Sequence, residues 1–172
     1  MKKNFITLLI LLVFPINVFA LIEVDITRGN LNPLPLAVSP LSIDDQSRKS
    51  FEKILKKKDI GSEISSIVEN NLRTSGLFNP LSKDAFLQAP DIANLKPRFE
   101  DWNLIKAQAL ITGKVTYTNE KLRVEFRLWD ILAAKEMMAL AFTTVPSNWR
   151  RVGHIISDKV YERLTGEKGY FD

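Results

Sequence analysis

The pattern of apolar and polar residues predicts five β-strands along the chain. In the first, residues 21–28, an apolar face alternates strictly with a polar face, and Gly29 and Asn30 end it before an irregular connection through Pro33. The other strands are residues 34–41, 109–117, 122–128 and 138–144. Because short turns join the last three, we expect an antiparallel meander. Residues 122–128 alternate as well, which predicts that Trp129 lies on a solvated face with the arginines.

Apolar residues recur with helical spacing in three further segments. We predict a helix that Ser62 caps and Gly76 ends, because serine favours the first cap and glycine the last. A short helix is predicted at residues 99–106, and a long final helix is predicted from Ser147, as its cap, to Gly166.

Two stretches have no clear periodicity. Residues 42–59 are polar and basic, so a solvated loop is the default expectation, and a short basic helix or a mobile insertion is the alternative. Residues 77–97 are predicted to be short pieces joined by loops. The whole pattern predicts an α/β (α+β) fold, in which helices pack on a mixed sheet.

Residues 1–20 have the features of a secretory signal peptide. Lys2 and Lys3 precede an apolar run, and the segment ends at Ala20, a small residue typical of a cleavage site. A membrane-spanning helix is the alternative, but the apolar run is too short and Pro15 interrupts it. We therefore predict cleavage after Ala20, export, and no membrane span in the mature chain.

Composition narrows the class of protein. The chain has no cysteine, which excludes disulfides and thiolate metal sites. Its 45% content of hydrophobic residues is enough for the core of one domain. Removing residues 1–20 takes away Lys2 and Lys3 and no acidic residue, so the net charge falls from +4 to +2. Such a weak charge on an exported protein does not predict nucleic acid as a partner.

The residues do not predict a catalytic site. His154, Ser157 and Asp158 are the residue types of a hydrolytic triad. Ser157 and Asp158 are consecutive on one predicted helix and point about 100° apart, so His154 cannot link them as a base. We expect instead a solvated pair of His154 with Asp158, four residues apart. A pair of carboxylates that meet in space stays open, and no metal or cofactor is predicted.

Binding is the class of function that remains. Residues 21–28 have the backbone groups and the apolar face that β-augmentation uses, and the sequence after them predicts a flexible tether that lets the strand leave its own domain. The predicted partner-binding residues are Ile22, Glu23, Val24, Asp25, Ile26, Thr27 and Arg28. An ordinary edge strand is the alternative for this segment. Two other functions stay open: a polyanion- or lipid-binding surface at residues 53–58, and an exported hydrolase that uses scattered carboxylates.

Three stretches of sequence resemble the amino-terminal domains of the TolB family of the Tol-Pal envelope system. Residues 151–172, RVGHIISDKVYERLTGEKGYFD, resemble the final helix of those domains and the start of their linker. Residues 71–81, NLRTSGLFNPL, and residues 102–115, which end ALITGKV, are similar as well. The resemblance implies a periplasmic location in a Gram-negative bacterium and a fold similar to anticodon-binding domains.

The resemblance also implies a function. In the family, the strand that residues 21–28 match docks on the C-terminal domain of the inner-membrane protein TolA. A six-bladed propeller follows and binds the lipoprotein Pal, and the system serves outer-membrane integrity and cell division and is exploited by colicins. The chain would thus be a non-catalytic adaptor that binds TolA.

Two features depart from the family pattern. Residues 44–58 are longer and more basic than expected, and the sequence stops at Asp172, where a propeller would follow. Pal is therefore expected as a partner only where a propeller is supplied elsewhere. The expected organisation is a signal peptide at 1–20, a binding strand and tether at 21–33, a domain at 34–166 and the start of a linker at 167–172.

Overall fold

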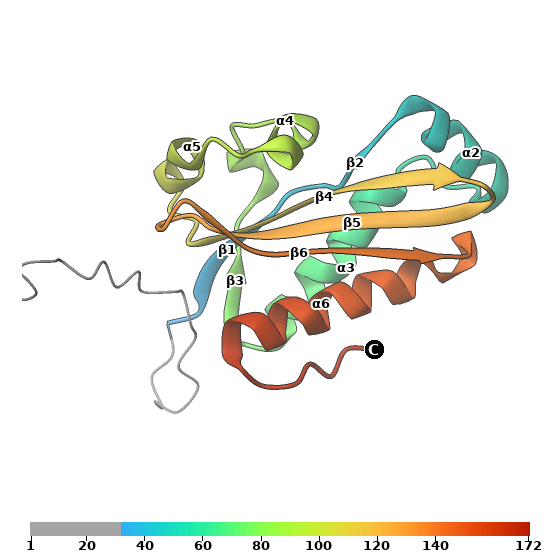
Figure 1. The fold of residues 1–172 in the computed structure, drawn as a ribbon. Coiled ribbons are helices and arrows are strands. Elements are labelled where there is room, and N and C mark those ends of the chain that lie inside the picture. Colours follow the sequence, from blue (N-terminus) through green and yellow to red (C-terminus); the bar gives the residue numbers. More distant parts are fainter. Residues whose placement is uncertain (1–31) are drawn as a thin grey trace, which may run out of the picture.

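The computed structural model describes residues 32–172, which form a six-stranded mixed sheet with helices packed on it (Figure 1). The predicted signal peptide, residues 1–20, and the predicted binding strand, residues 21–28, both lie outside the described residues. The strands are β1 (Leu34–Val38), β2 (Ser42–Ile43), β3 (Phe78–Pro80), β4 (Ala109–Thr118), β5 (Lys121–Asp130) and β6 (Lys135–Thr144). The α-helices are α2 (Asp45–Leu55), α3 (Ile60–Thr74), α4 (Pro90–Leu95), α5 (Phe99–Leu104) and α6 (Trp149–Thr165), and two 3₁₀ turns are η1 (Lys83–Ala85) and η2 (Pro146–Asn148). The predicted fold class is confirmed.

Strand order in the sheet is β3-β1-β4-β5-β6, and the short strand β2 also pairs with β4. β1 is parallel to both of its neighbours, with Leu36 opposite Pro80 of β3 and Ala109 of β4. β4, β5 and β6 form the predicted antiparallel meander. β1 is therefore an interior strand, and β6 is a long strand at one end of the sheet.

One face of the sheet carries the main core. α3 and α6 lie side by side across this face, and Phe51 of α2 closes the end of the core against Tyr117, with ring centroids 5.4 Å apart (Figure 1). Alternate residues of β4 and β5 point into it, as the apolar pattern of these strands predicts. The fully buried strand residues on this side include Leu36, Ala109, Ile111, Val115, Leu122, Val124 and Leu128.

The opposite face is covered at one end only. α5 packs there through Phe99, whose ring lies 5.9 Å from that of Trp129, and Trp102 is buried beside them. The Trp129 indole N–H donates to the Thr112 hydroxyl over 2.9 Å. The prediction of a solvated Trp129 was wrong: only 7% of its surface is exposed, because a distant helix covers that part of the sheet.

Two helices begin with the same four-residue pattern, an aspartate followed by a serine three positions later. Asp44 accepts a hydrogen bond from the Ser47 amide at 2.9 Å, and Asp59 accepts one from the Ser62 amide at 3.0 Å. Ser62 therefore receives the cap and does not provide it, contrary to the prediction, because the helix starts one turn earlier. The predicted cap of α6, Ser147, is also wrong, since η2 occupies that position and no side chain caps α6.

Residues 42–59, for which a loop was the default expectation, contain β2 and the eleven-residue helix α2. Two contacts explain the helix. Phe51 is fully buried, and the Ser47 hydroxyl accepts a hydrogen bond from the Tyr117 amide at 2.8 Å, which joins the first turn of α2 to β4. The alternative expectation, a short basic helix, is the correct one.

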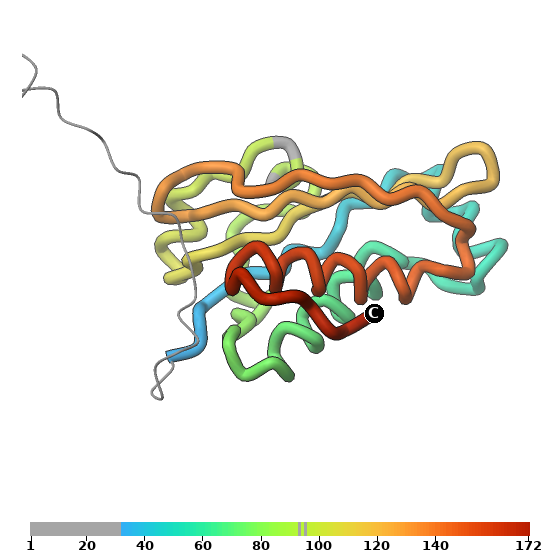
Figure 2. The backbone as a smooth tube through the Cα atoms, turned by 60° about the horizontal axis from the view of Figure 1, so that its bottom comes forward, coloured from blue at the N-terminus to red at the C-terminus, as the bar shows by residue number. Residues whose placement is uncertain are grey.

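After Gly166 ends α6 in a left-handed conformation, the chain turns and runs back along the helix (Figure 2). The carboxylate of Asp158 accepts the backbone amides of Phe171 and Asp172, at 2.7 and 3.2 Å. Phe171 packs against Tyr161, with ring centroids 5.9 Å apart. Residues 167–172, predicted to be the start of a linker, are thus packed on the domain.

Candidate functional site

The structure places the entry of the chain into the domain, although the predicted binding residues 22–28 lie outside the described residues. Leu34 begins β1, and its amide donates to the Leu77 carbonyl over 2.9 Å. β1 then continues between β3 and β4, where Leu36 is fully buried. Anything bound just upstream of β1 would therefore be joined to the centre of the sheet.

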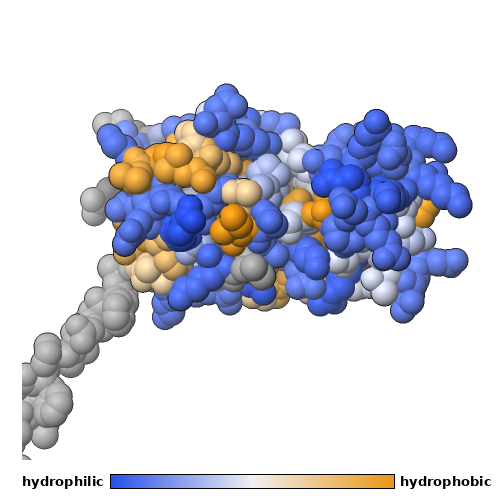
Figure 3. Space-filling view, turned by 90° about the horizontal axis from the view of Figure 1, so that it is seen from above, coloured by the Kyte–Doolittle hydropathy of each residue, from blue (hydrophilic) through white to orange (hydrophobic). Residues whose placement is uncertain are grey.

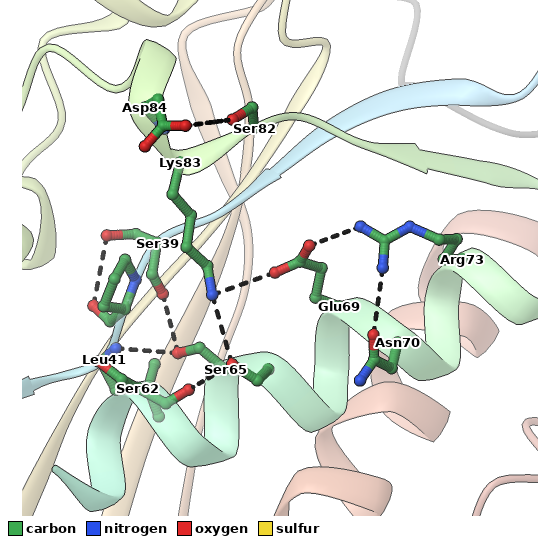
Figure 4. Close-up of polar contacts among 12 residues, drawn as sticks. Ser39, Leu41, Ser62, Ser65, Glu69, Asn70, Arg73, Ser82, Lys83 and Asp84 are labelled. Carbon is green, nitrogen blue, oxygen red and sulfur yellow. Dashed lines mark hydrogen bonds and ion pairs between the residues drawn. The ribbon is translucent and has the colours of Figure 1, made fainter.

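Polar contacts fix the far end of β1 on α3 (Figure 4). The buried Ser65 hydroxyl accepts a hydrogen bond from the Leu41 amide at 3.0 Å and donates to the Ser39 carbonyl at 3.1 Å. Ser39 and Leu41 are both buried, and a buried backbone group left without a hydrogen bond is costly. Ser65 thus fixes where the chain leaves β1.

A charged cluster joins α3 to η1 on the same side (Figure 4). Glu69 lies 2.6 Å from Arg73 and 3.1 Å from Lys83. Burial raises the pKa of the Glu69 carboxyl, but hydrogen bonds from Arg73 and Lys83 outweigh burial, and the pKa lies below its ordinary value. The cluster is a structural link between two elements, with all three side chains turned to one another.

β6 offers a free backbone edge. Among residues 32–172 it pairs with a strand on one side only. A bulge opposite Leu128 and Trp129 interrupts its first part, and there the Met137 carbonyl accepts a hydrogen bond from Arg163 at 3.4 Å. Residues 138–144 after it have no charged side chain, and Leu140 is 38% exposed. A bulge and charges protect the start of this edge and leave the remainder open to another strand.

The hydrolase-like residues on α6 have structural partners. His154 Nδ1 lies 2.9 Å from the Asn71 amide nitrogen, and the same nitrogen donates to the Ser157 hydroxyl over 3.0 Å. Ser157 itself is fully buried and donates to the Gly153 carbonyl. These contacts join α3 to α6. The prediction that His154 pairs with Asp158 was wrong. His154 contacts Asn71, and Asp158 accepts hydrogen bonds from the backbone amides of the C-terminal segment.

Lys57 in the basic segment at residues 53–58 contacts two residues that were not predicted from the sequence. The Lys57 ammonium lies 2.6 Å from Glu63 and 5.4 Å from the ring centroid of Trp149, at the start of α6. Arg150 stacks on the same ring at 4.4 Å. Only the fold brings these residues together, because Lys57 and Trp149 are far apart in the sequence.

Two shallow polar clefts flank α2. One, of about 460 Å³, lies between the start of α2 and the tip of the β4–β5 hairpin, and the other, of about 420 Å³, lies beside β2 and includes Arg48 and Asp91. Within the described residues, no three histidine or acidic side chains gather as metal ligands. Likewise, none of the helices in residues 32–172 is long and apolar enough to cross a membrane.

Comparison with known proteins decides the family. A family model for the TolB amino-terminal domain matches residues 22–137, which is more than half of the chain. The chain belongs to the TolB amino-terminal domain family. The predicted family is thereby confirmed, and the matched residues include two of the three stretches that carry the resemblance, 71–81 and 102–115.

The Tol-Pal system protein TolB of Pelagibacter ubique (strain HTCC1062) is 80% identical over 164 residues, which are 95% of this chain and 37% of that protein. A crystal structure of TolB from Acinetobacter baumannii matches with a TM-score of 0.64 and 22% identity, over 87% of this chain and 32% of that one. The second match shows a shared fold. The chain spans about a third of the length of each relative.

Proposed function

We propose that this chain is a non-catalytic periplasmic component of the Tol-Pal system, and that residues 21–28 bind the C-terminal domain of TolA by adding a strand to its sheet. The observation that carries the proposal is the 80% identity with a Tol-Pal system protein TolB over nearly the whole chain. The family match begins at Ile22, so it includes the proposed strand. Export by residues 1–20 and a role in outer-membrane integrity and cell division belong to the same proposal.

The chemistry of the described residues supports an adaptor. His154 and Ser157 hold α3 to α6, and the packed Trp102 and Trp129 belong to the second core. The strand that follows residues 21–28 is paired on both sides, so a partner bound there would be anchored to the centre of the sheet. Residues 34–166 are proposed as the domain and 167–172 as the start of a linker. Pal binding is proposed only for a protein that also supplies a propeller.

The test compares two forms of the chain. The chain from Leu21 onward and a form that starts at Gly29 are titrated against the TolA C-terminal domain by calorimetry. We expect binding by the longer form and none by the shorter form. Equal binding by both would sink the assignment of the site to residues 21–28.

A proline scan then tests the mode of binding. Proline is placed in turn at Glu23, Val24, Asp25 and Ile26. In an added strand only alternate amides face the partner sheet, so proline at every second position should weaken binding by about tenfold or more, while the other positions are affected less. Thr27→Ala is the control that keeps every backbone amide. A uniform loss along the scan would contradict strand addition.

A further inference from the structure

The end of α2 and the start of α6 bring exposed cations to one corner of the molecule. Lys53 lies in the last turn of α2, and Lys56 and Lys58 follow it. Arg150 joins them from α6, because it shares the Trp149 ring with Lys57. We call the exposed residues Lys53, Lys56, Lys58 and Arg150 the basic corner.

Most of this charge is not neutralised. Lys57 is excluded from the basic corner because Glu63 binds it at 2.6 Å. Lys58 lies 3.8 Å from Glu52, but its side chain is 82% exposed, and so open a pair contributes little. Within the described part of the chain, no ion pair involves Lys53, Lys56 or Arg150. Lys53, Lys56 and Arg150 are thus exposed cations that have no ion-pair partner among residues 32–172.

The backbone and the neighbouring surface set the corner apart from an ordinary solvated face. Lys56 adopts a left-handed conformation with φ of 56°, a position at which glycine would cost less. Ile54 beside it is 45% exposed. In Figure 3, hydrophilic residues predominate at the α2 end of the upper face. Cations around an exposed aliphatic side chain are typical of surfaces that contact anionic lipid headgroups.

We propose that the basic corner binds an anionic phospholipid surface. Its cations come from the end of α2 and the first turn of α6, which meet where Lys57 and Arg150 contact the Trp149 ring. β1 begins at the opposite end from α2 (Figure 1), so a partner bound upstream of β1 would leave the corner accessible. The inference is thus independent of the proposed TolA contact.

The experiment uses the chain from Leu21 onward, so that the apolar residues 5–13 do not bind membranes themselves. Its sedimentation is measured with vesicles of phosphatidylcholine alone and with about 30% phosphatidylglycerol, at low salt and at about 0.5 M salt. We expect binding to the anionic vesicles at low salt only. The test variant is Lys53→Gln with Lys56→Gln and Arg150→Gln, which should weaken binding roughly 10- to 100-fold.

The matched control is Lys96→Gln with Lys135→Gln and Lys168→Gln, which removes the same net charge from other exposed positions. It should bind within about twofold of the unchanged chain, because headgroup attraction decays within a Debye length. Circular dichroism checks that both variants keep the fold. Absence of binding, binding that salt does not reduce, or an equal loss in the control would overturn the proposal, as would retention on heparin without vesicle binding.

Discussion

Two small residues of α3, Gly61 and Ser65, determine how closely the helix approaches the sheet. A Cβ atom on Gly61 would be 2.0 Å from the Leu41 carbonyl oxygen, so glycine allows the helix to approach the end of the β1–β2 connection. Ser65, one turn later, makes the hydrogen bonds to the same connection. Small side chains on this face of α3 therefore set the distance between the helix and the sheet.

The prediction at this position compares two glycines. Gly61→Ala should lower the free energy of unfolding by about 1–3 kcal/mol, because the backbone around Leu41 must move. Gly76→Ala has open space around the new atom but a φ of 74°, and should cost about 1 kcal/mol through backbone conformation alone. Urea unfolding of both variants measures the difference. Equal losses would mean that close approach is not what Gly61 provides.

Helix α2 exists because capping and one buried ring outweigh its polar composition. Asp44 caps the first turn, and Phe51 enters the main core. The hydrogen bond from the Ser47 amide is the largest cause that holds the pKa of the Asp44 carboxyl below its ordinary value. A lowered pKa means that Asp44 stabilises the fold at pH above the ordinary aspartate pKa, and that this contribution is lost as pH falls through the lowered value.

Asp44→Ala should therefore lower the free energy of unfolding by about 1 kcal/mol at neutral pH. The difference from the unchanged chain should narrow as pH falls from about 4, the ordinary aspartate pKa, through the lowered folded-state pKa of Asp44, below which the carboxylate is protonated in both states. Asp45→Ala, in the same first turn but without the cap, is the control and should cost less. Urea unfolding at a series of pH values checks both. A difference that stays constant down to strongly acidic pH would contradict the capping role.

The packing of the C-terminal segment extends the domain beyond α6. Asp158 binds two amides of this segment, and Gly169 passes so close that a Cβ atom there would be 2.4 Å from the Asp158 backbone. Phe171 is partly buried and packs against the main core. The direction in which the chain leaves α6 is thus set by side chains of the helix itself.

Phe171→Ala should lower the free energy of unfolding by about 1–2 kcal/mol, because it removes a partly buried ring from Tyr161. Hydrogen exchange of the amides of residues 171 and 172 should accelerate, since they leave Asp158. Arg151→Ala breaks only the exposed pair with Asp172 and should leave the midpoint of unfolding unchanged. Slow exchange that persists in Phe171→Ala would show that the segment does not depend on its ring.

Local pattern was sufficient for the strands of the meander, for the existence of α3, α5 and α6, and for the ends at Gly76 and Gly166, because alternation and capping act over a few residues. The family followed from short stretches of sequence. The predicted binding strand at residues 21–28 stays a prediction. Ser62 and Ser147 were misassigned because serine fits several positions around a helix start.

Only the tertiary structure decided which strands lie inside the sheet and which lie at its ends. It buried Trp129 under α5, placed His154 against Asn71 of α3, and brought Lys57, just after α2, and Arg150 to the ring of Trp149. Each of these contacts joins residues that are far apart in the sequence, and the period of a helix or strand contains no information about which distant element will cover a face. The sequence by itself determined the elements and their apolar faces, and packing determined their neighbours.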